Sequence, residues 1–104
     1  MALSEYSVRV DIAAKSKMGK HARFLAKISV PAAQRLRNAY YSALKSLEQN
    51  PQRCPQYKPN SYIDEELRYL LFSGRYRIVF EIVDKTVYVY DVQDARQDDD
   101  KNLL

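Results

Sequence analysis

The sequence has one cysteine and one histidine, and this scarcity limits the chemistry that it can carry. Cys54 has no second cysteine in the chain, so neither an internal disulfide nor a cysteine-based zinc site is available. His21 alone cannot supply a histidine-rich metal site, and the sequence contains no G-x-S-x-G elbow for a serine nucleophile. We therefore expect neither a metal nor a small-molecule cofactor.

Long apolar runs are also missing. No apolar stretch approaches the roughly 18 residues that a membrane span needs. The N-terminus, MALSEYSVRV, lacks the charged-then-apolar layout of a secretory signal. These absences predict a cytoplasmic protein with no membrane partner. With 104 residues and 46% hydrophobic content, the chain is expected to form a single domain over residues 1–104.

The charge that is present is spread unevenly. Residues 1–60 hold 11 Lys/Arg against 3 Asp/Glu, whereas residues 61–104 hold 6 against 10. A basic half suits a polyanion or an acidic partner, but it is equally typical of solvated helix faces. Both interpretations stay open for five closely spaced cations, which could meet an acidic partner, ribosomal RNA or only solvent: Lys15, Lys17, Lys20, Arg23 and Lys27.

The first part of the chain predicts a strand followed by two helices. Residues 6–13 alternate between apolar and polar side chains, which is typical of a strand with one wet face. Residues 15–27 repeat apolar side chains at helical spacing, although Gly19 weakens a helix there by about 1 kcal/mol relative to alanine.

The second helix carries clear end signals. Ser29 is a plausible N-cap, Pro31 falls in the first turn, and Pro51 ends the helix near Asn50. One apolar stripe runs along it, made of Leu36, Tyr40, Ala43 and Leu47. The two helices are therefore expected to form a hairpin.

The rest of the chain predicts a loop and a three-stranded meander. Residues 51–66 contain three prolines and read as a long loop. Three strands follow at 67–72, 75–83 and 86–93, joined by tight turns, and a polar acidic tail begins at about 97. The predicted fold is α+β, in the order β-α-α-β-β-β, with a helical hairpin packed on one face of a small, mostly antiparallel sheet.

Two arginines fall inside the most strand-like segment. Strand periodicity places Arg75 and Arg77 on the face opposite Tyr76, away from the helices, and Arg68 is a further candidate for that face. A purely structural role is the alternative for Arg77. If the next hairpin has a three-residue loop, Arg77 lies directly opposite Asp91, in an exposed cross-strand pair worth roughly 0.2–1 kcal/mol. With a two-residue loop, Arg77 lies diagonal to Asp91 instead.

The order of elements, together with LRYLLFSGRYRIVFEIVDKTVYVYDVQDAR at residues 67–96, resembles the RelE/ParE superfamily, the toxins of bacterial type II toxin–antitoxin modules. The start of the second helix around Pro31 and its L-x-x-N-P ending look more like the ParE branch. The resemblance implies a toxin that a cognate antitoxin protein wraps and holds inactive. It implies DNA gyrase as the target for the ParE branch, and the ribosome with its mRNA for the RelE branch.

The resemblance also suggests roles for individual residues. Arg77 stands where ribosome-dependent RNases of this superfamily keep a catalytic arginine, which would stabilise a phosphate in the transition state. Arg68 stands where a catalytic or phosphate-binding cation is found in the preceding strand. Arg96 can stand for one residue of the superfamily's basic pair near the C-terminus. Three further candidates follow from position and chemistry rather than from the resemblance: Arg75 on the sheet face would bind phosphate or the target, and Tyr57 and Tyr62 in the long loop would stack on a base.

Departures from the RelE pattern favour the ParE-like interpretation. Leu70 replaces a lysine of that pattern, and the C-terminal histidine and late tyrosine are absent. Arginine cannot act as a base, which leaves glutamates as candidates, and a cluster of aspartates would repel a phosphate. The candidate bases are Glu65, Glu66 and Glu81. The aspartates of the repelling cluster are Asp91, Asp94, Asp98, Asp99 and Asp100.

The main prediction is therefore a ParE-like toxin that inhibits growth by binding a macromolecular target. A RelE-like, ribosome-dependent mRNA endoribonuclease is the alternative, so whether the chain is an enzyme stays open. A non-toxic family member that retains only partner binding is a further alternative.

Overall fold

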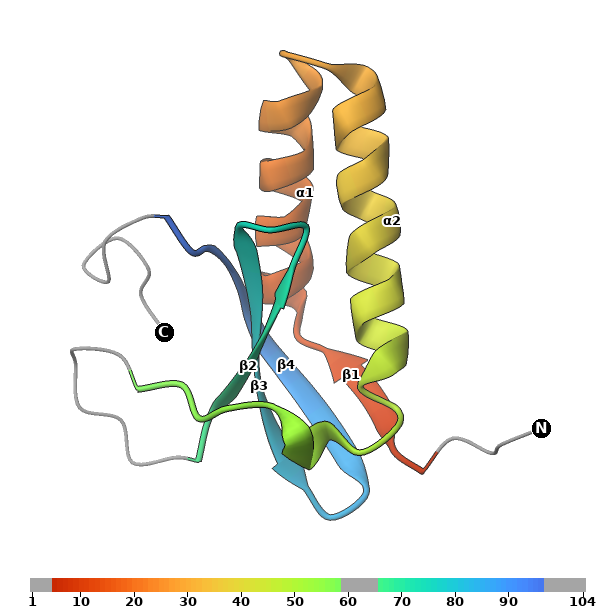
Figure 1. Ribbon diagram of the computed structural model, residues 1–104, viewed down its shortest axis with the longest axis vertical. Coiled ribbons are helices and arrows are strands. Elements are labelled where there is room, and N and C mark those ends of the chain that lie inside the picture. The colour runs from red at the N-terminus through yellow and green to blue at the C-terminus, as the bar shows by residue number, and fades with distance from the viewer. Residues whose placement is uncertain (1–4, 59–65, 97–104) are drawn as a thin grey trace.

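Two helices pack against one face of a four-stranded sheet in the computed structural model, which describes residues 5–58 and 66–96 (Figure 1). The sheet order is β1-β4-β3-β2, with β1 parallel to β4 and the other pairs antiparallel. The α+β prediction is thus confirmed. The elements are β1 (Ser7–Val10), α1 (Ile12–Ala26), α2 (Val30–Ser46), a 3₁₀ turn (Pro51–Arg53), β2 (Arg68–Phe72), β3 (Tyr76–Val83) and β4 (Thr86–Asp94).

The first strand is shorter, and the first helix longer, than the alternation predicted. Asp11 caps α1, because its carboxylate accepts a hydrogen bond from the backbone N–H of Ala13. The strand therefore stops at Val10, and Ile12 belongs to the helix with 81% of its surface exposed. The capping residue decided the boundary, which an alternating pattern alone could not reveal.

The second helix begins where the sequence indicated. The hydroxyl of Ser29 accepts a hydrogen bond from the N–H of Ala32 at 3.2 Å, which confirms the predicted N-cap. The helix ends at Ser46, earlier than the predicted end near Asn50. The chain after Ser46 turns, and Asn50 adopts a left-handed conformation with φ of 48° before Pro51.

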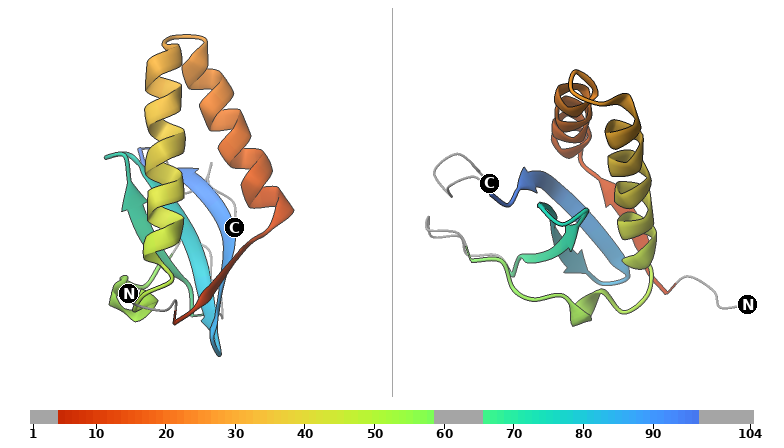
Figure 2. Two further views of the ribbon diagram at one scale, coloured as in Figure 1. Left: turned by 90° about the vertical axis from the view of Figure 1, so that its right-hand side faces the viewer. Right: turned by 45° about the horizontal axis from the view of Figure 1, so that its top comes forward.

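The main core lies between the helical hairpin and the sheet (Figure 2). Tyr76, Ile78 and Phe80 of β3 face the helices, as their alternation predicted. The helices contribute Ala14, Met18 and Ala22 from α1, and Leu36, Tyr40 and Ala43 from α2. The apolar stripe predicted for the second helix is therefore its buried face.

Replacing Gly19 with alanine is expected to raise the free energy of unfolding by about 0.5–1 kcal/mol. Gly19 lies in the middle of α1, where glycine costs backbone entropy. A Cβ there would lie 3.1 Å from Nη1 of Arg23, the end of an exposed and flexible side chain that can move aside. Urea denaturation of the two proteins measures the gain, and a loss of stability would show that Arg23 cannot move.

A β-bulge sets the pairing between β3 and β4. Val83 pairs with Thr86, so the hairpin has a two-residue turn, and the three-residue alternative is wrong. Val79 pairs with Asp91 but Phe80 pairs with Val89, which leaves one extra residue in β4. Because of this shift, Gln93 lies directly opposite Arg77, and Asp91 lies diagonal to it.

The sheet face away from the helices, where Arg75 and Arg77 were predicted, is partly covered by residues of the segment predicted to be a loop. Residues 55–57 run along the free edge of β2, where Tyr57 N–H donates to the Leu67 carbonyl at 2.7 Å. A second small core forms there from Tyr57, Leu67, Tyr69, Val79 and Tyr90. The rest of the predicted loop, residues 59–65, and the tail from 97 lie outside the described residues.

Candidate functional site

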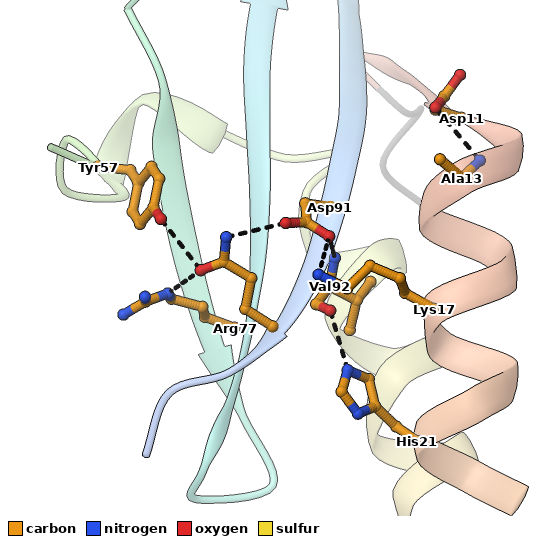
Figure 3. A network of polar contacts seen from close by, with 9 residues as sticks. Asp11, Ala13, Lys17, His21, Tyr57, Arg77, Asp91 and Val92 are labelled. Carbon is orange, nitrogen blue, oxygen red and sulfur yellow. Dashed lines mark hydrogen bonds and ion pairs between the residues drawn. The ribbon is translucent and has the colours of Figure 1, made fainter. Parts of the chain in front are cut away.

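A buried glutamine, Gln93, organises the polar groups on this second face. Figure 3 labels its three partners, Tyr57, Arg77 and Asp91. The side-chain oxygen of Gln93 accepts hydrogen bonds from Nε of Arg77 at 2.7 Å and from the hydroxyl of Tyr57 at 3.2 Å. Its amide nitrogen donates to the carboxylate of Asp91 at 2.9 Å. Gln93 is fully buried, so both ends of its side chain are committed to these neighbours.

Asp91 connects this group to the first helix. Its carboxylate also accepts a hydrogen bond from the N–H of Val92 and pairs with Nζ of Lys17 at 2.8 Å. Lys17 can reach it because β1 pairs with β4 only as far as Val89. Beyond that residue, side chains of α1 occupy the strand edge, and Nε2 of His21 lies 3.0 Å from the carbonyl oxygen of Val92 (Figure 3).

Arg77 is held in one orientation by these neighbours. Its guanidinium carbon lies 5.0 Å from the centre of the Tyr57 ring, while Nε is bound to Gln93. The side chain is half-buried. Arginine is planar and charged at every physiological pH, so this arrangement fixes a cation at a defined place on the sheet face.

Arg68 does not join Arg77. It pairs with Phe80, so its side chain leaves the sheet on the helix side, opposite to Arg77. Its guanidinium donates to the carbonyl oxygens of Gln52 and Cys54, which holds the 3₁₀ turn against β2. Burial raises the pKa of the Cys54 thiol, and the positive charges of Arg53 and Arg68 lower that pKa by a smaller amount. The resemblance placed Arg68 and Arg77 together, whereas strand pairing separates them.

Arg75 and Arg96 gather around Asp94 at the end of β4. The prediction that Arg75 lies in the strand is wrong, because β3 begins at Tyr76 and Arg75 belongs to the turn before it. Nη2 of Arg75 pairs with Asp94 at 2.7 Å. Nε of Arg96 lies 3.7 Å from the same carboxylate. Asp91 and Asp94 are thus each paired with cations, so the repulsion that we expected from them is reduced. Residues 98–100 lie outside the described residues.

Of the two candidate stacking residues, only Tyr57 lies in the described part of the chain. Tyr57 is only 7% exposed, since its ring contacts Arg77 on one side and the edge of Tyr69 on another. The expectation that its ring is open to a base is therefore wrong for this conformation, and Tyr57 instead supports Arg77. Tyr62 and the candidate base Glu65 lie outside the described residues.

Acid is expected to remove a stabilising contribution from Asp94. Burial alone would raise the pKa of its carboxyl, but the hydrogen bonds from Arg75 and Arg96 and their charges lower that pKa overall. Because the unfolded value is about 3.9, the contribution is complete above about pH 4 and is lost as the pH falls through the folded value. Urea denaturation should show the stability difference between wild type and Asp94→Asn shrinking from about pH 6 to about pH 2.5. A constant difference would contradict this assignment.

Sequence reasoning missed Lys17 as a partner of Asp91, and Gln93 altogether. A glutamine between apolar residues of a predicted strand was the available signal for Gln93, but its position opposite Arg77 depends on the bulge. In the described part of the chain, no group of three or more His, Cys, Asp or Glu could hold a metal ion. Neither helix there is long and apolar enough to cross a membrane.

Two helices packed on a small, open, mixed sheet of four strands define the RelE/ParE class of fold. A family model described as the ParE toxin of type II toxin-antitoxin system, parDE, matches residues 8–99, and the chain belongs to this ParE toxin family. Among solved structures, a chain from "Chromosomal ParDE TA system from P. aeruginosa" is similar with a TM-score of 0.70 and 12% identity. The match covers 90% of this chain and 100% of that one, and at this identity it shows the fold. No curated protein sequence matches the chain.

Proposed function

We propose that the chain inhibits growth by binding a macromolecular target through the sheet face around Arg77, and that a cognate antitoxin neutralises it. The observation that carries this proposal is the fixed guanidinium of Arg77, which is bound to Gln93 and lies over Tyr57. A cation that is already oriented loses little side-chain entropy when it binds an anionic group of a partner. Arg75 and Arg96 add positive charge at the end of the same sheet.

DNA gyrase is the first target to test, because the resemblance to the ParE branch points to it. Target binding also fits the geometry better than RNA cleavage does. Glu81 follows Arg77 by four residues along β3, a distance of about 13 Å in an extended strand, and it accepts a hydrogen bond from the hydroxyl of Tyr90. Asp91 is buried and paired with Lys17. Neither Glu81 nor Asp91 is therefore placed to act as a base beside Arg77.

Induced expression in bacteria tests the proposal. Wild type should arrest growth, co-expression of the adjacent small gene should relieve the arrest, and Arg77→Ala should abolish it. The matched control is Arg35→Ala, which removes an exposed arginine from α2 and should arrest growth as wild type does. Circular dichroism should confirm that both variants fold.

The target is identified with purified components. In a supercoiling assay, wild-type protein should inhibit gyrase, and Arg77→Ala should need about tenfold more protein for the same inhibition. Full arrest by Arg77→Ala would remove this arginine from the mechanism. Codon-positioned mRNA cuts without gyrase inhibition would favour the endoribonuclease, and no arrest by wild type in several hosts would favour a non-toxic family member.

A further inference from the structure

A cavity of about 270 Å³ opens between the two helices of the hairpin. The helices diverge from their connecting turn toward β1, as the left view of Figure 2 shows. The less exposed part of the lining is apolar and consists of Val10, Met18, Tyr40 and Leu44. The exposed part of the lining consists of Lys15, Arg37 and Tyr41. The cavity is therefore a groove with an apolar floor and a cationic rim.

Two rows of side chains flank this groove. The row on α1 consists of residues four positions apart, which lie on one face of a helix: Lys15, Gly19, Arg23 and Lys27. The row on α2 is spaced in the same way: Arg37, Tyr41 and Lys45. A Cβ at Gly19 would lie 3.1 Å from Nη1 of Arg23, so this guanidinium reaches back toward the groove that Gly19 lines. The cations extend over about 18 Å along α1 and about 12 Å along α2.

Carboxylates of the hairpin cannot neutralise these cations. Residues 12–47 contain eight lysines and arginines and no aspartate or glutamate. Within residues 5–58 and 66–96, only Lys17 of these eight forms an ion pair, and its partner is Asp91 of β4. The five cations of the two rows are all exposed. A ligand in the groove therefore meets positive charge on both sides.

We infer that this groove binds a segment of single-stranded nucleic acid, with phosphates beside the two rows of cations and a base stacked on Tyr41. A cationic groove that follows the backbone, combined with an aromatic ring for the bases, is how proteins bind single strands without sequence preference. Tyr41 is 60% exposed and lies between Arg37 and Lys45 in its row. The inference goes beyond the proposed function and does not rest on it, because Arg77 lies on the sheet face away from the helices.

The arrangement of the charges favours a nucleic acid over an anionic membrane or an acidic polypeptide. A membrane contact needs apolar side chains beside the cations, but the exposed Phe24, Ile28 and Val30 gather at the far end of the hairpin. The charge of a polypeptide varies along its sequence. Every nucleotide carries a phosphate, which matches cations that recur in two facing rows.

Fluorescence anisotropy of a labelled oligothymidylate of about 12 nucleotides tests the inference with the full chain. The dissociation constant should fall within the roughly 10⁻⁴–10⁻⁶ M of sequence-independent binding, and log K should fall with log salt concentration at a slope of about −3. Lys15→Gln/Arg37→Gln should weaken binding at least about tenfold near 0.1 M salt and flatten the slope by about 1. The matched control, Lys20→Gln/Arg35→Gln, also removes one lysine from α1 and one arginine from α2, but off the two rows. It should weaken binding less than about threefold.

Stacking on Tyr41 is tested separately. Tyr41→Ala should weaken binding about tenfold without changing the salt slope, because it removes a ring and no charge. Tyr41→Phe keeps the ring and should bind within about twofold of wild type. The chain has two glycines, and their amide signals report the location of the strand. The signal of Gly19 in the groove should shift during an NMR titration, whereas that of Gly74 in the turn before β3 should not.

Three results would overturn the inference: a dissociation constant above about 10⁻³ M near 0.1 M salt, equal weakening by the two double variants, or wild-type affinity in Tyr41→Ala. Displacement of the oligonucleotide at equal charge concentration by polyglutamate, or by phosphatidylglycerol vesicles, would also overturn it and identify an acidic polypeptide or a membrane as the ligand. Thermal melting shows whether each variant is folded, and the salt slope of wild type depends on no variant. Binding is measured without gyrase or an antitoxin, so its failure and the failure of the proposed function are distinguishable.

Discussion

Gln93→Leu is expected to lower the free energy of unfolding by about 3 kcal/mol and to remove growth arrest. The side chain of Gln93 is fully buried and takes part in three hydrogen bonds, with Arg77, Tyr57 and Asp91. Leucine fills a similar space but can neither accept nor donate. Each buried polar group that loses its partner costs about 1–3 kcal/mol, and the orientation of Arg77 is lost with them.

Gln93→Glu separates the two expected effects. Glutamate can still accept from Arg77 and Tyr57, so growth arrest should survive. It cannot donate to Asp91 and places a second carboxylate beside a buried one, so stability should fall. Urea denaturation gives the stabilities and a growth curve gives the function. Arrest by the leucine variant equal to wild type would show that Gln93 does not position Arg77.

The helices and strands could be predicted because the spacing of apolar residues along each of them shows which face is buried. The alternation of Tyr76, Ile78 and Phe80 places those residues in the core, as the structure confirms. The stripe on α2 does the same at helical spacing, and Ser29 marks where that helix starts. These signals are local, since each depends on residues within a few positions of one another.

The geometry of the candidate site depends on contacts that a local pattern does not carry. The bulge in β4 has no distinctive residue, yet it moves Gln93 opposite Arg77. Arg68 was grouped with Arg77 by resemblance, but pairing with Phe80 directs it to the opposite face. Burial of Tyr57 requires residues 55–57 to run along β2. In each case the deciding factor is how two separate segments of the chain pair with each other, and neither segment alone shows that pairing.

The charge pattern illustrates the same limit. The aspartates near the end of the chain suggested a field that repels phosphate, because a sequence shows charges without their partners. In the structure, Lys17 from α1 pairs with Asp91, and Arg75 pairs with Asp94. The basic segment instead retains, among the described residues, unpaired cations at Lys15 on α1 and Arg37 on α2.

Lys17→Met is expected to lower the free energy of unfolding by about 2–3 kcal/mol, a larger loss than that of Asp91→Asn. The reason is the unequal exposure of the pair, since the side chain of Asp91 is 4% exposed and that of Lys17 is 33% exposed. Without Lys17, a carboxylate remains buried with only neutral donors from Val92 and Gln93. Without the carboxylate, the ammonium of Lys17 can turn into water, so less is lost.

A double-mutant cycle measures this coupling. Lys17→Met/Asp91→Asn should be more stable than Lys17→Met alone, with a coupling energy of about 1–2 kcal/mol, because the neutral amide no longer needs a cation. Lys20→Met is the matched control, since it removes an exposed lysine from the same helix and should change stability by less than about 0.5 kcal/mol. Equal losses for Lys17→Met and Lys20→Met would mean that the ion pair contributes nothing. If coupling is found, α1 stabilises the position of Arg77 through Asp91 and Gln93, and Lys17→Met should then weaken growth arrest where Lys20→Met does not.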